Sequence, residues 1–256
     1  MDHRDKLVRA TEHFQALKAA VLEYSGWNRS VVPEYEASTR RYLARFKLLK
    51  PLPRRWSLIL GDAIHNVRSS LDALVFALAS RHSGPLSSQE AKDVQFVIAD
   101  NAQEFGKQKA RRLGRLSPAA QDLIEAMQPY VPCSWHGGNP LGAIRDLDNT
   151  NKHRHLIINK VRIDHGNLYI EKPGVTGGQG LVIPLTPGLY SDGDVLAEFA
   201  LPPGYDTVNM RTGHSIGLDH CIADVNLPLT SGLQNFANYV PTYVEQQVFR
   251  PLEALP

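Results

Sequence analysis

Apolar residues recur at helical spacing along the N-terminal part of the chain. Over residues 7–24 they follow one another in steps of three or four, with charged residues between them, which predicts an amphipathic helix. A longer stripe predicts a helix over about residues 54–80, and Pro53 suits its first turn. The apolar stripe of this long helix consists of Leu60, Ile64, Val67, Leu71, Leu74 and Leu78. Shorter helices are predicted over residues 102–109, 117–128 and 141–151.

Period-two alternation marks a second kind of segment. Residues 36–48 alternate between apolar and charged side chains, which predicts one early strand. From residue 156 onward, short β-branched stretches are separated by turns rich in Gly, Pro and Asp, a pattern typical of an antiparallel sheet. The strands expected there span residues 156–163, 167–171, 181–185, 195–200 and 215–225. A further short strand is predicted over residues 95–98.

Together these elements predict an α+β fold. Residues 1–155 form a mainly helical region around the long helix, with one early strand, and residues 156–256 form an antiparallel β region. A final amphipathic helix over about residues 230–249 belongs to this second region, and Pro241 should bend or split it. With 256 residues and 43% hydrophobic content, the chain is long enough for a sizeable core, which we expect both regions to share.

Composition and charge narrow the classes of partner. The formal net charge of +2 is too small to indicate nucleic-acid binding by bulk charge alone. Two cysteines, Cys133 and Cys221, fit a reducing cytoplasm rather than a disulfide scaffold. The most apolar stretch, residues 71–79, contains Asp72 and is far shorter than the roughly 20 residues of a membrane helix. We therefore expect a cytoplasmic protein without a membrane partner and, because no P-loop or dinucleotide motif occurs, without a cofactor. A homo-oligomer is compatible with the sequence.

Polar residues on the long helix are the first candidate for chemistry. Asp62, His65, Asn66, Ser69 and Asp72 are three or four residues apart and therefore share one face. Arg68 lies near the edge of that face, within reach of Asp72. Because an unpaired buried polar group costs about 1–3 kcal/mol, this stripe needs partners.

A second polar cluster lies at residues 146–155, where a helix is expected to give way to a strand. Lys152, His153, Arg154 and His155 follow one another, and four such side chains cannot all be buried at low cost. Some of them must face solvent or a ligand, and the others can pair with the polar stripe of the long helix. The sequence therefore predicts that the two clusters face each other.

The residue types in these clusters favour recognition of phosphate, in RNA or in a nucleotide. Imidazole can move protons near neutral pH, and guanidinium, ammonium and amide groups can hold phosphate oxygens. The catalytic candidates are His65 and His153. The phosphate-binding candidates are Asn66, Arg68, Lys152 and Arg154, with Asp62 and Asp72 to orient them.

Two other hypotheses remain open on the sequence, and so does the question of catalysis itself. In the first, the polar clusters are a structural clamp in which Asp62 and Asp72 pair with Lys152 or Arg154, and the protein is a non-enzymatic phage or defence-linked binding protein. In the second, a metal-dependent hydrolase uses residues of both clusters, although no H-E-x-x-H spacing supports a metal site. The ligands in that case would be Asp62, His65, His153 and His155. No G-x-S-x-G elbow surrounds Ser69, which favours a hydrogen-bonding helix residue over a nucleophile.

Two motifs carry a resemblance to known proteins. The stretches GDAIHNVRSSLDALVFALA and LDNTNKHRHL resemble a family of uncharacterised bacterial and phage proteins with a GDxxHNxRSxLD helix and a downstream LxxLxNxxKHR segment. A looser similarity is to HEPN-type helical domains, whose signature is an arginine followed, after four to six residues, by a histidine. Here Arg145 and His153 have seven residues between them, one more than that signature allows. The second resemblance implies a metal-independent ribonuclease.

Overall fold

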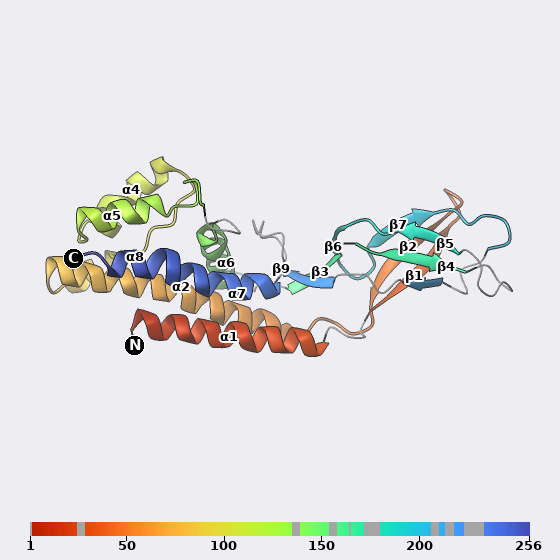
Figure 1. The fold of residues 1–256 in the computed structure, drawn as a ribbon, viewed down its shortest axis with the longest axis horizontal. Coiled ribbons are helices and arrows are strands. Elements are labelled where there is room, and N and C mark those ends of the chain that lie inside the picture. Colours follow the sequence, from red (N-terminus) through yellow and green to blue (C-terminus); the bar gives the residue numbers. More distant parts are fainter. Residues whose placement is uncertain are drawn as a thin grey trace. The chain divides into compact units, whose positions relative to one another are not determined.

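The computed structural model describes residues 2–24, 29–134, 139–153, 158–163, 165–171, 180–205, 210–212, 218–222 and 233–256. The chain is α+β, as predicted, with helices and antiparallel sheets (Figure 1). It divides into two compact units that interleave along the sequence. The helical unit comprises Met1–Ala19, Arg54–Ile157 and Asp224–Pro256, and the β unit comprises Ala20–Pro53 and Ile158–Ala223. This division differs from the expected boundary after residue 155, because the early strand belongs with the later strands and the final helix with the earlier helices.

The helical unit is built from long helices that run side by side (Figure 1). These are α1 (His3–Tyr24), α2 (Arg54–Ser83) and a C-terminal run of α7 (Leu233–Tyr243), the π-helix η1 (Val244–Phe249) and α8 (Arg250–Glu253). The shorter helices are α3 (Ser88–Asp93), α4 (Ala102–Leu113), α5 (Pro118–Ala126) and α6 (Leu141–His153).

Apolar packing holds the long helices together. All six residues of the predicted α2 stripe are buried, and each fully buried leucine or isoleucine contributes about 1.5–3 kcal/mol relative to an exposed one. The Phe14 ring of α1 meets the Phe236 ring of α7 edge to face, with centroids 6.2 Å apart. Pro241 lies inside α7, and the run changes to π-helical register at Val244. The interruption expected at this proline therefore takes the form of a change in helical register.

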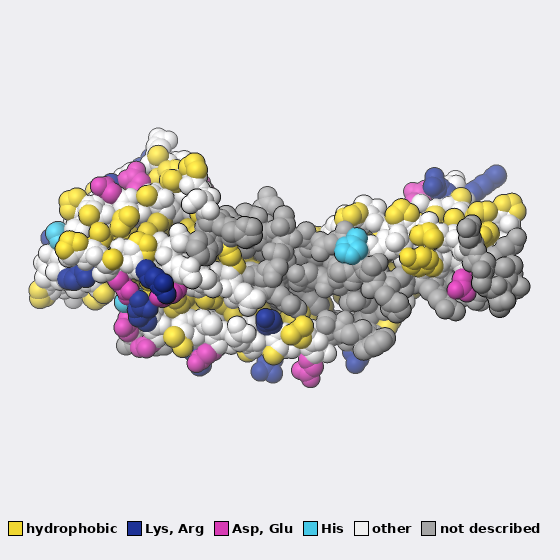
Figure 2. Space-filling model, viewed as in Figure 1, with side chains coloured by type: hydrophobic (Ala, Val, Ile, Leu, Met, Phe, Trp, Pro, Cys, Tyr) yellow, Lys and Arg dark blue, Asp and Glu magenta, His cyan; other side chains and the backbone are white. Residues whose placement is uncertain are grey.

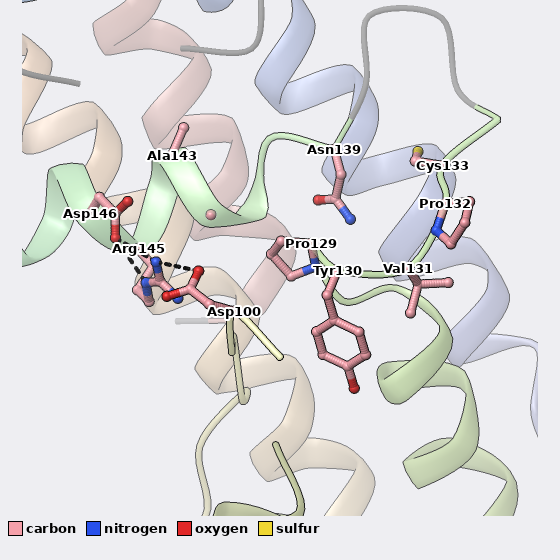
Figure 3. Close-up of a pocket in the computed structure, with 11 residues that line it drawn as sticks. Asp100, Pro129, Tyr130, Val131, Pro132, Cys133, Asn139, Ala143, Arg145 and Asp146 are labelled. Atoms are coloured by element: carbon pink, nitrogen blue, oxygen red, sulfur yellow. Dashed lines mark hydrogen bonds and ion pairs between the residues drawn. The ribbon is translucent and has the colours of Figure 1, made fainter. Parts of the chain in front are cut away.

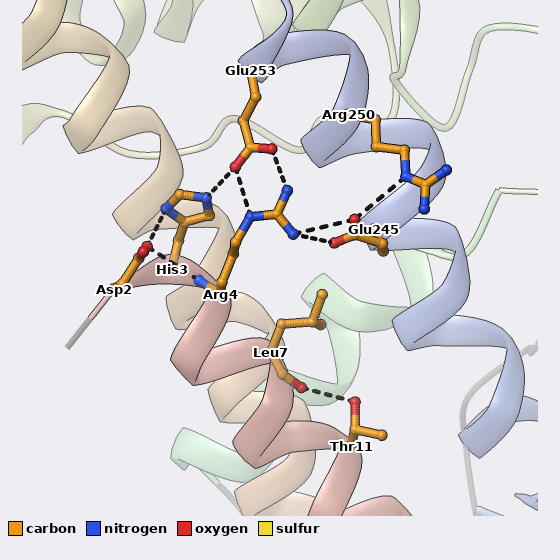
Figure 4. Close-up of polar contacts among 8 residues, drawn as sticks. All are labelled: Asp2, His3, Arg4, Leu7, Thr11, Glu245, Arg250 and Glu253. Atoms are coloured by element: carbon orange, nitrogen blue, oxygen red, sulfur yellow. Dashed lines mark hydrogen bonds and ion pairs between the residues drawn. The ribbon is translucent and has the colours of Figure 1, made fainter.

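Ion pairs tie the start of α1 to the end of the chain (Figure 4). The Arg4 guanidinium bonds both carboxylate oxygens of Glu253 and also reaches Glu245. The His3 ring lies between Asp2, at 2.6 Å from Nδ1, and Glu253, at 2.7 Å from Nε2. Partial burial acts to raise the pKa of Glu253, but hydrogen bonds from Arg4 and His3 outweigh that effect and hold it below its usual range.

The described residues of the β unit form three antiparallel sheets of three strands each, with the orders β1-β2-β7, β6-β3-β9 and β5-β4-β8. Its strands are β1 (Arg29–Glu36), β2 (Arg41–Leu48), β3 (Ile158–Ile163), β4 (Asn167–Ile170), β5 (Leu181–Pro184), β6 (Gly188–Tyr190), β7 (Val195–Phe199), β8 (Met210–Thr212) and β9 (Leu218–Ile222). Side chains from several of these strands meet in one buried cluster. On β2 the period-two pattern is realised directly, since Ala44 and Phe46 are buried and Arg45 between them is not.

The short strand predicted over residues 95–98 is wrong. Residues 94–99 have no ladder partner, yet Phe96 and its neighbours are buried. Side chains take the place of a sheet here: the Phe96 N–H donates to Asp72 at 2.9 Å, and the Ala99 N–H donates to Gln128 at 2.8 Å. The apolar run predicted burial correctly, but the hydrogen bonds that satisfy its backbone come from side chains of α2 and of the turn after α5.

The sequence did not predict β1 or several short elements. The single early strand expected over residues 36–48 is wrong, because β1 ends at Glu36, residues 37–40 form a turn, and β2 begins at Arg41. Strand β1 contains Pro33, which weakened its strand pattern, and β6 and β8 have only three residues each. Helix α3 is six residues long and begins with a capping box in which Ser87 and Glu90 bond reciprocally. A helix of six residues is too short to show a repeating apolar pattern, so its capping residues are the clearer signal in the sequence.

Surface charge on the visible face is mixed in sign. Figure 2 shows basic and acidic side chains beside one another on this face, with apolar patches between them. The described side chains on this face therefore form no extended basic field of the kind that binds nucleic acid by charge alone. Among the helices of the described residues, none combines the length and the apolar character needed to cross a bilayer.

Candidate functional site

Helix α2 presents the predicted polar stripe, and its members differ in exposure. The His65 side chain is 57% exposed, and Asp62 is also exposed. The Asn66 side chain donates to the Asp62 carbonyl oxygen at 2.8 Å, so its amide is partly used by its own helix. The stripe therefore lies at the surface of α2 next to the buried apolar face.

Helix α6 packs directly against α2, so the described part of the second cluster, residues 146–152, lies against the long helix. The two helices approach closely at Gly61, where an added Cβ would lie 2.5 Å from Oδ1 of Asn151. A side chain at this position would require Asn151 to move. The close packing brings the second half of α6 beside His65.

A buried carboxylate joins the two helices. Asp148 of α6 has a side chain only 2% exposed, and the Lys152 ammonium lies 2.5 Å from its Oδ2 atom. Its Oδ1 atom lies 3.5 Å from Nδ1 of His65. That distance allows an ion pair but lacks hydrogen-bond geometry, so Oδ1 has no hydrogen-bond partner among the described residues. Because an unsatisfied buried acceptor is costly, a small movement of the imidazole toward Oδ1 would lower the free energy.

The far side of the imidazole meets a hydroxyl group. Ser69 Oγ lies 3.5 Å from His65 Nε2, one turn further along α2. Lys152, Asp148, His65 and Ser69 thus form one continuous polar chain across two helices, which we call the α2–α6 site. Its Lys152 and His65 side chains are 48% and 57% exposed, while the carboxylate that links them is buried.

Arg68 and Asp72 belong to a different arrangement. The Arg68 guanidinium bonds Asp72 at 2.9 Å and the Phe96 carbonyl oxygen at 2.6 Å, and Asp72 accepts from the Phe96 N–H. These two side chains fix the buried segment 94–99 to α2. Their bonding capacity is directed to the protein itself, which indicates a structural role. The clamp expected from the sequence paired Asp72 with Lys152 or Arg154, whereas here Asp72 pairs with Arg68 and Lys152 pairs with Asp148.

The remaining predicted residues are placed only in part. His153 is the last residue of α6, and its side chain lies outside the described part of the structure, as do Arg154 and His155. Within the described residues, no group of three or more His, Cys, Asp or Glu side chains could hold a metal ion. The metal set proposed from the sequence included His153 and His155 and therefore lies partly outside those residues.

Asp148 is the site residue that sequence reasoning missed. The signal was present, because Asp148 follows Leu141 by seven residues and Ile144 by four, and both of these are buried. A charged residue on the apolar stripe of a helix must be buried and must find a partner. Lys152, one turn later, is that partner.

A pocket of about 530 Å³ lies on another side of α6 (Figure 3). Its walls include Pro129, Pro132 and the Arg145 side chain, which bonds Asp100 and Asp146. Burial acts to lower the pKa of Arg145, but its hydrogen bonds to the two carboxylates raise it overall. None of the residues predicted as a site lines this pocket.

Comparison with known proteins gives no relative. No protein-family model matches the chain, and no curated protein or solved structure is significantly similar to it.

Proposed function

We propose that the protein recognises phosphate groups of RNA or of a nucleotide at the α2–α6 site and cleaves a phosphoester bond there. The observation that carries this proposal is the buried Asp148 carboxylate, which holds a lysine and a histidine from two helices at the surface. The imidazole lies beside this buried anion and is itself exposed, so it can meet a ligand that arrives from solvent. In this site His65 moves protons and Lys152 holds a phosphate oxygen.

Charge supports an anionic ligand of modest size. Lys152 neutralises Asp148, so protonation of His65 leaves the three groups with a net positive charge. The formal net charge of the whole chain is only +2. A nucleotide or a short single-stranded RNA fits this local charge better than a long duplex, whose binding depends on many phosphate contacts.

The experiment compares binding and cleavage by the wild type, His65→Ala and Lys152→Ala. Binding is followed by fluorescence anisotropy with a labelled RNA oligonucleotide and a labelled nucleotide, and cleavage by gel or chromatography. We expect Lys152→Ala to weaken binding about tenfold or more, as for the loss of a charge-assisted hydrogen bond. We expect His65→Ala to slow cleavage by about 10²–10⁴-fold with less effect on binding.

Matched controls come from the same chain. His82 is an exposed histidine at the other end of α2, and Lys107 is an exposed lysine on α4. Alanine at either position should leave binding and cleavage unchanged. The proposal would be refuted if His65→Ala and His82→Ala lost cleavage equally, or if neither His65→Ala nor Lys152→Ala changed binding or cleavage. An arm with excess chelator separates the metal-independent, HEPN-like reaction from the metal-dependent alternative, which loses activity when the metal is removed.

A second candidate function is that of a non-enzymatic binding protein whose polar residues are structural. The observation that favours it is the complete use of Arg68 and Asp72 in fixing the backbone at Phe96. Chemical denaturation distinguishes the two functions at the α2–α6 site itself. A purely structural role predicts that Lys152→Ala lowers stability by several kcal/mol, whereas a functional site predicts little loss.

A further inference from the structure

The Ser69 hydroxyl differs in its partner from three other hydroxyls on helices of the helical unit. Thr11, Ser70 and Thr242 each donate to a backbone carbonyl of the preceding turn, at 2.7–3.0 Å. This back-bonding is the usual arrangement of serine and threonine inside a helix. Ser69 instead has His65 Nε2 as its recorded partner, at 3.5 Å. Its hydroxyl is therefore directed to the imidazole rather than to the helix backbone.

A hydrogen bond at one ring nitrogen of His65 determines which nitrogen carries the proton. The acceptor beside Nδ1 is Oδ1 of Asp148, at 3.5 Å and without hydrogen-bond geometry. A small movement of the ring would let Nδ1–H donate to this oxygen, which can only accept, and the hydrogen would then be fixed on Nδ1. In this tautomer Nε2 is unprotonated and can accept the proton of the Ser69 hydroxyl. A hydroxyl, an imidazole and a buried carboxylate in this order are the groups that activate a serine nucleophile. Both contacts are long at 3.5 Å, as catalytic contacts often are before a substrate closes the site.

We infer that Ser69 is the nucleophile of the α2–α6 site and forms a covalent phosphoserine intermediate. This inference rests on the proposed function and extends it. Ser69 Oγ attacks the phosphorus atom while His65 Nε2 takes the hydroxyl proton. The phosphoester P–O bond breaks, and His65 returns the proton to the departing alkoxide, which leaves as an alcohol.

A water molecule completes the cycle. It attacks the phosphorus of phosphoserine, His65 takes its proton, the Oγ–P bond breaks, and Ser69 recovers its hydrogen from His65. The net reaction is hydrolysis of one phosphoester bond, without a change in oxidation state. The Lys152 ammonium, on the other oxygen of the same carboxylate, supplies positive charge for the phosphoryl oxygens.

This chemistry makes a distinctive prediction about the substrate. Metal-independent ribonucleases that use histidine can employ the ribose 2′-hydroxyl as nucleophile, and such enzymes do not cleave deoxyribose substrates. A serine nucleophile has no need of that hydroxyl. An oligonucleotide with 2′-deoxyribose at every position should therefore be cleaved as well as its RNA counterpart, within about tenfold.

Covalent capture tests the inference directly. The full chain is incubated with a fluorophosphonate probe, which loses fluoride to an activated serine and leaves a phosphonyl group on Oγ. Peptide mass spectrometry should locate the adduct on Ser69, and prior incubation with the RNA oligonucleotide should reduce the labelling. Ser69→Ala should lose the label and at least about 100-fold of the cleavage rate, while retaining binding within about threefold. Ser80→Ala, on the same helix, is the matched control and should resemble the wild type.

Each outcome is decisive, provided that circular dichroism shows Ser69→Ala to melt like the wild type. Labelling of Ser69 together with cleavage of the deoxyribose substrate supports the inference. Wild-type cleavage rates in Ser69→Ala, or cleavage of RNA but not of its deoxyribose counterpart, overturn the inference and leave the proposed function standing. Absence of both binding and cleavage in the wild type overturns the proposed function and the inference together.

Discussion

A methyl group added at Gly61 should disturb the packing of α6 on α2, and the disturbance should depend on Asn151. The new Cβ would lie 2.5 Å from Oδ1 and 2.8 Å from Cγ of Asn151, closer than such atoms approach in folded proteins. Forcing additional atoms into a close-packed contact costs about 1–3 kcal/mol. Alanine gains about 1 kcal/mol over glycine inside a helix. The net effect of Gly61→Ala should therefore be a destabilisation between about 0 and 2 kcal/mol.

Removing the Asn151 side chain should reverse the sign of this effect. In an Asn151→Ala background the three atoms nearest to the methyl group are gone, and the helix propensity of alanine should then stabilise the protein by about 1 kcal/mol. The two substitutions are coupled by the overpacking energy alone, about 1–3 kcal/mol. Gly106 provides a control, because a Cβ placed there, inside α4, meets no atom within 4 Å. Gly106→Ala should stabilise the protein in either background.

Urea denaturation of the four proteins, followed by circular dichroism at 222 nm, measures this coupling. The helices of the helical unit dominate that signal, and equal m-values would show that midpoints can be compared. Stabilisation by Gly61→Ala in both backgrounds would refute the close approach of α2 and α6 at this position. Equal destabilisation in both backgrounds would show that a group other than Asn151 sets the distance between the helices.

Other predictions concern the two polar arrangements and the chain ends. The pKa of Glu253 is lower in the folded protein than in the unfolded chain, where it is about 4.3. The carboxylate therefore stabilises the fold fully above about pH 4.3, and this stabilisation is lost as the pH falls through the folded pKa. Arg4→Ala should make the melting temperature less sensitive to acid. Arg68→Ala should lower the free energy of unfolding by about 1–3 kcal/mol in urea titrations, because Asp72 loses its charged partner; a change below about 0.5 kcal/mol would contradict the structural role. Asp148→Asn should abolish cleavage and change the free energy of unfolding by less than about 1 kcal/mol, since a functional carboxylate adds little to stability. A loss of several kcal/mol would indicate a structural residue instead.

Periodicity predicted most of the helical unit because its helices bury one stripe each. The stripe on α2 and the bounds of that helix followed from spacing alone. The failure at residues 94–99 has a physical cause, since burial of an extended segment does not require a sheet. Side chains of Arg68, Asp72 and Gln128 satisfy that backbone, and no local pattern in the segment indicates them. Hydrophobic periodicity compares residues that are close in sequence, so it cannot predict long-range side-chain hydrogen bonds of this kind.

The sequence predicted that two polar segments lie close together at the candidate site, but it did not predict which side chains contact one another. His65 and Lys152 were predicted as site residues from their imidazole and ammonium groups, and the structure links them through the Asp148 carboxylate. Residue types alone did not predict Asp148, because the basic run that follows it holds the imidazole and guanidinium groups expected at a phosphate site. A charged residue in register with a buried stripe is the stronger signal, since its burial obliges it to have a partner. The register of Asp148 with Leu141 identifies it without any structure.

The polar stripe of α2 serves two purposes because its residues meet different neighbours. Arg68 and Asp72 face a segment whose backbone groups would otherwise be unpaired, so their charges are bound within the protein. His65 and Ser69, on the same helix, face α6, where a single buried carboxylate already has a lysine on its other oxygen and leaves the imidazole exposed. Substitutions at two adjacent positions of α2 should therefore separate stability from chemistry: a change at Arg68 acts on unfolding, and a change at Ser69 acts on turnover. The separation follows from the direction of each side chain on the helix rather than from its distance along the sequence.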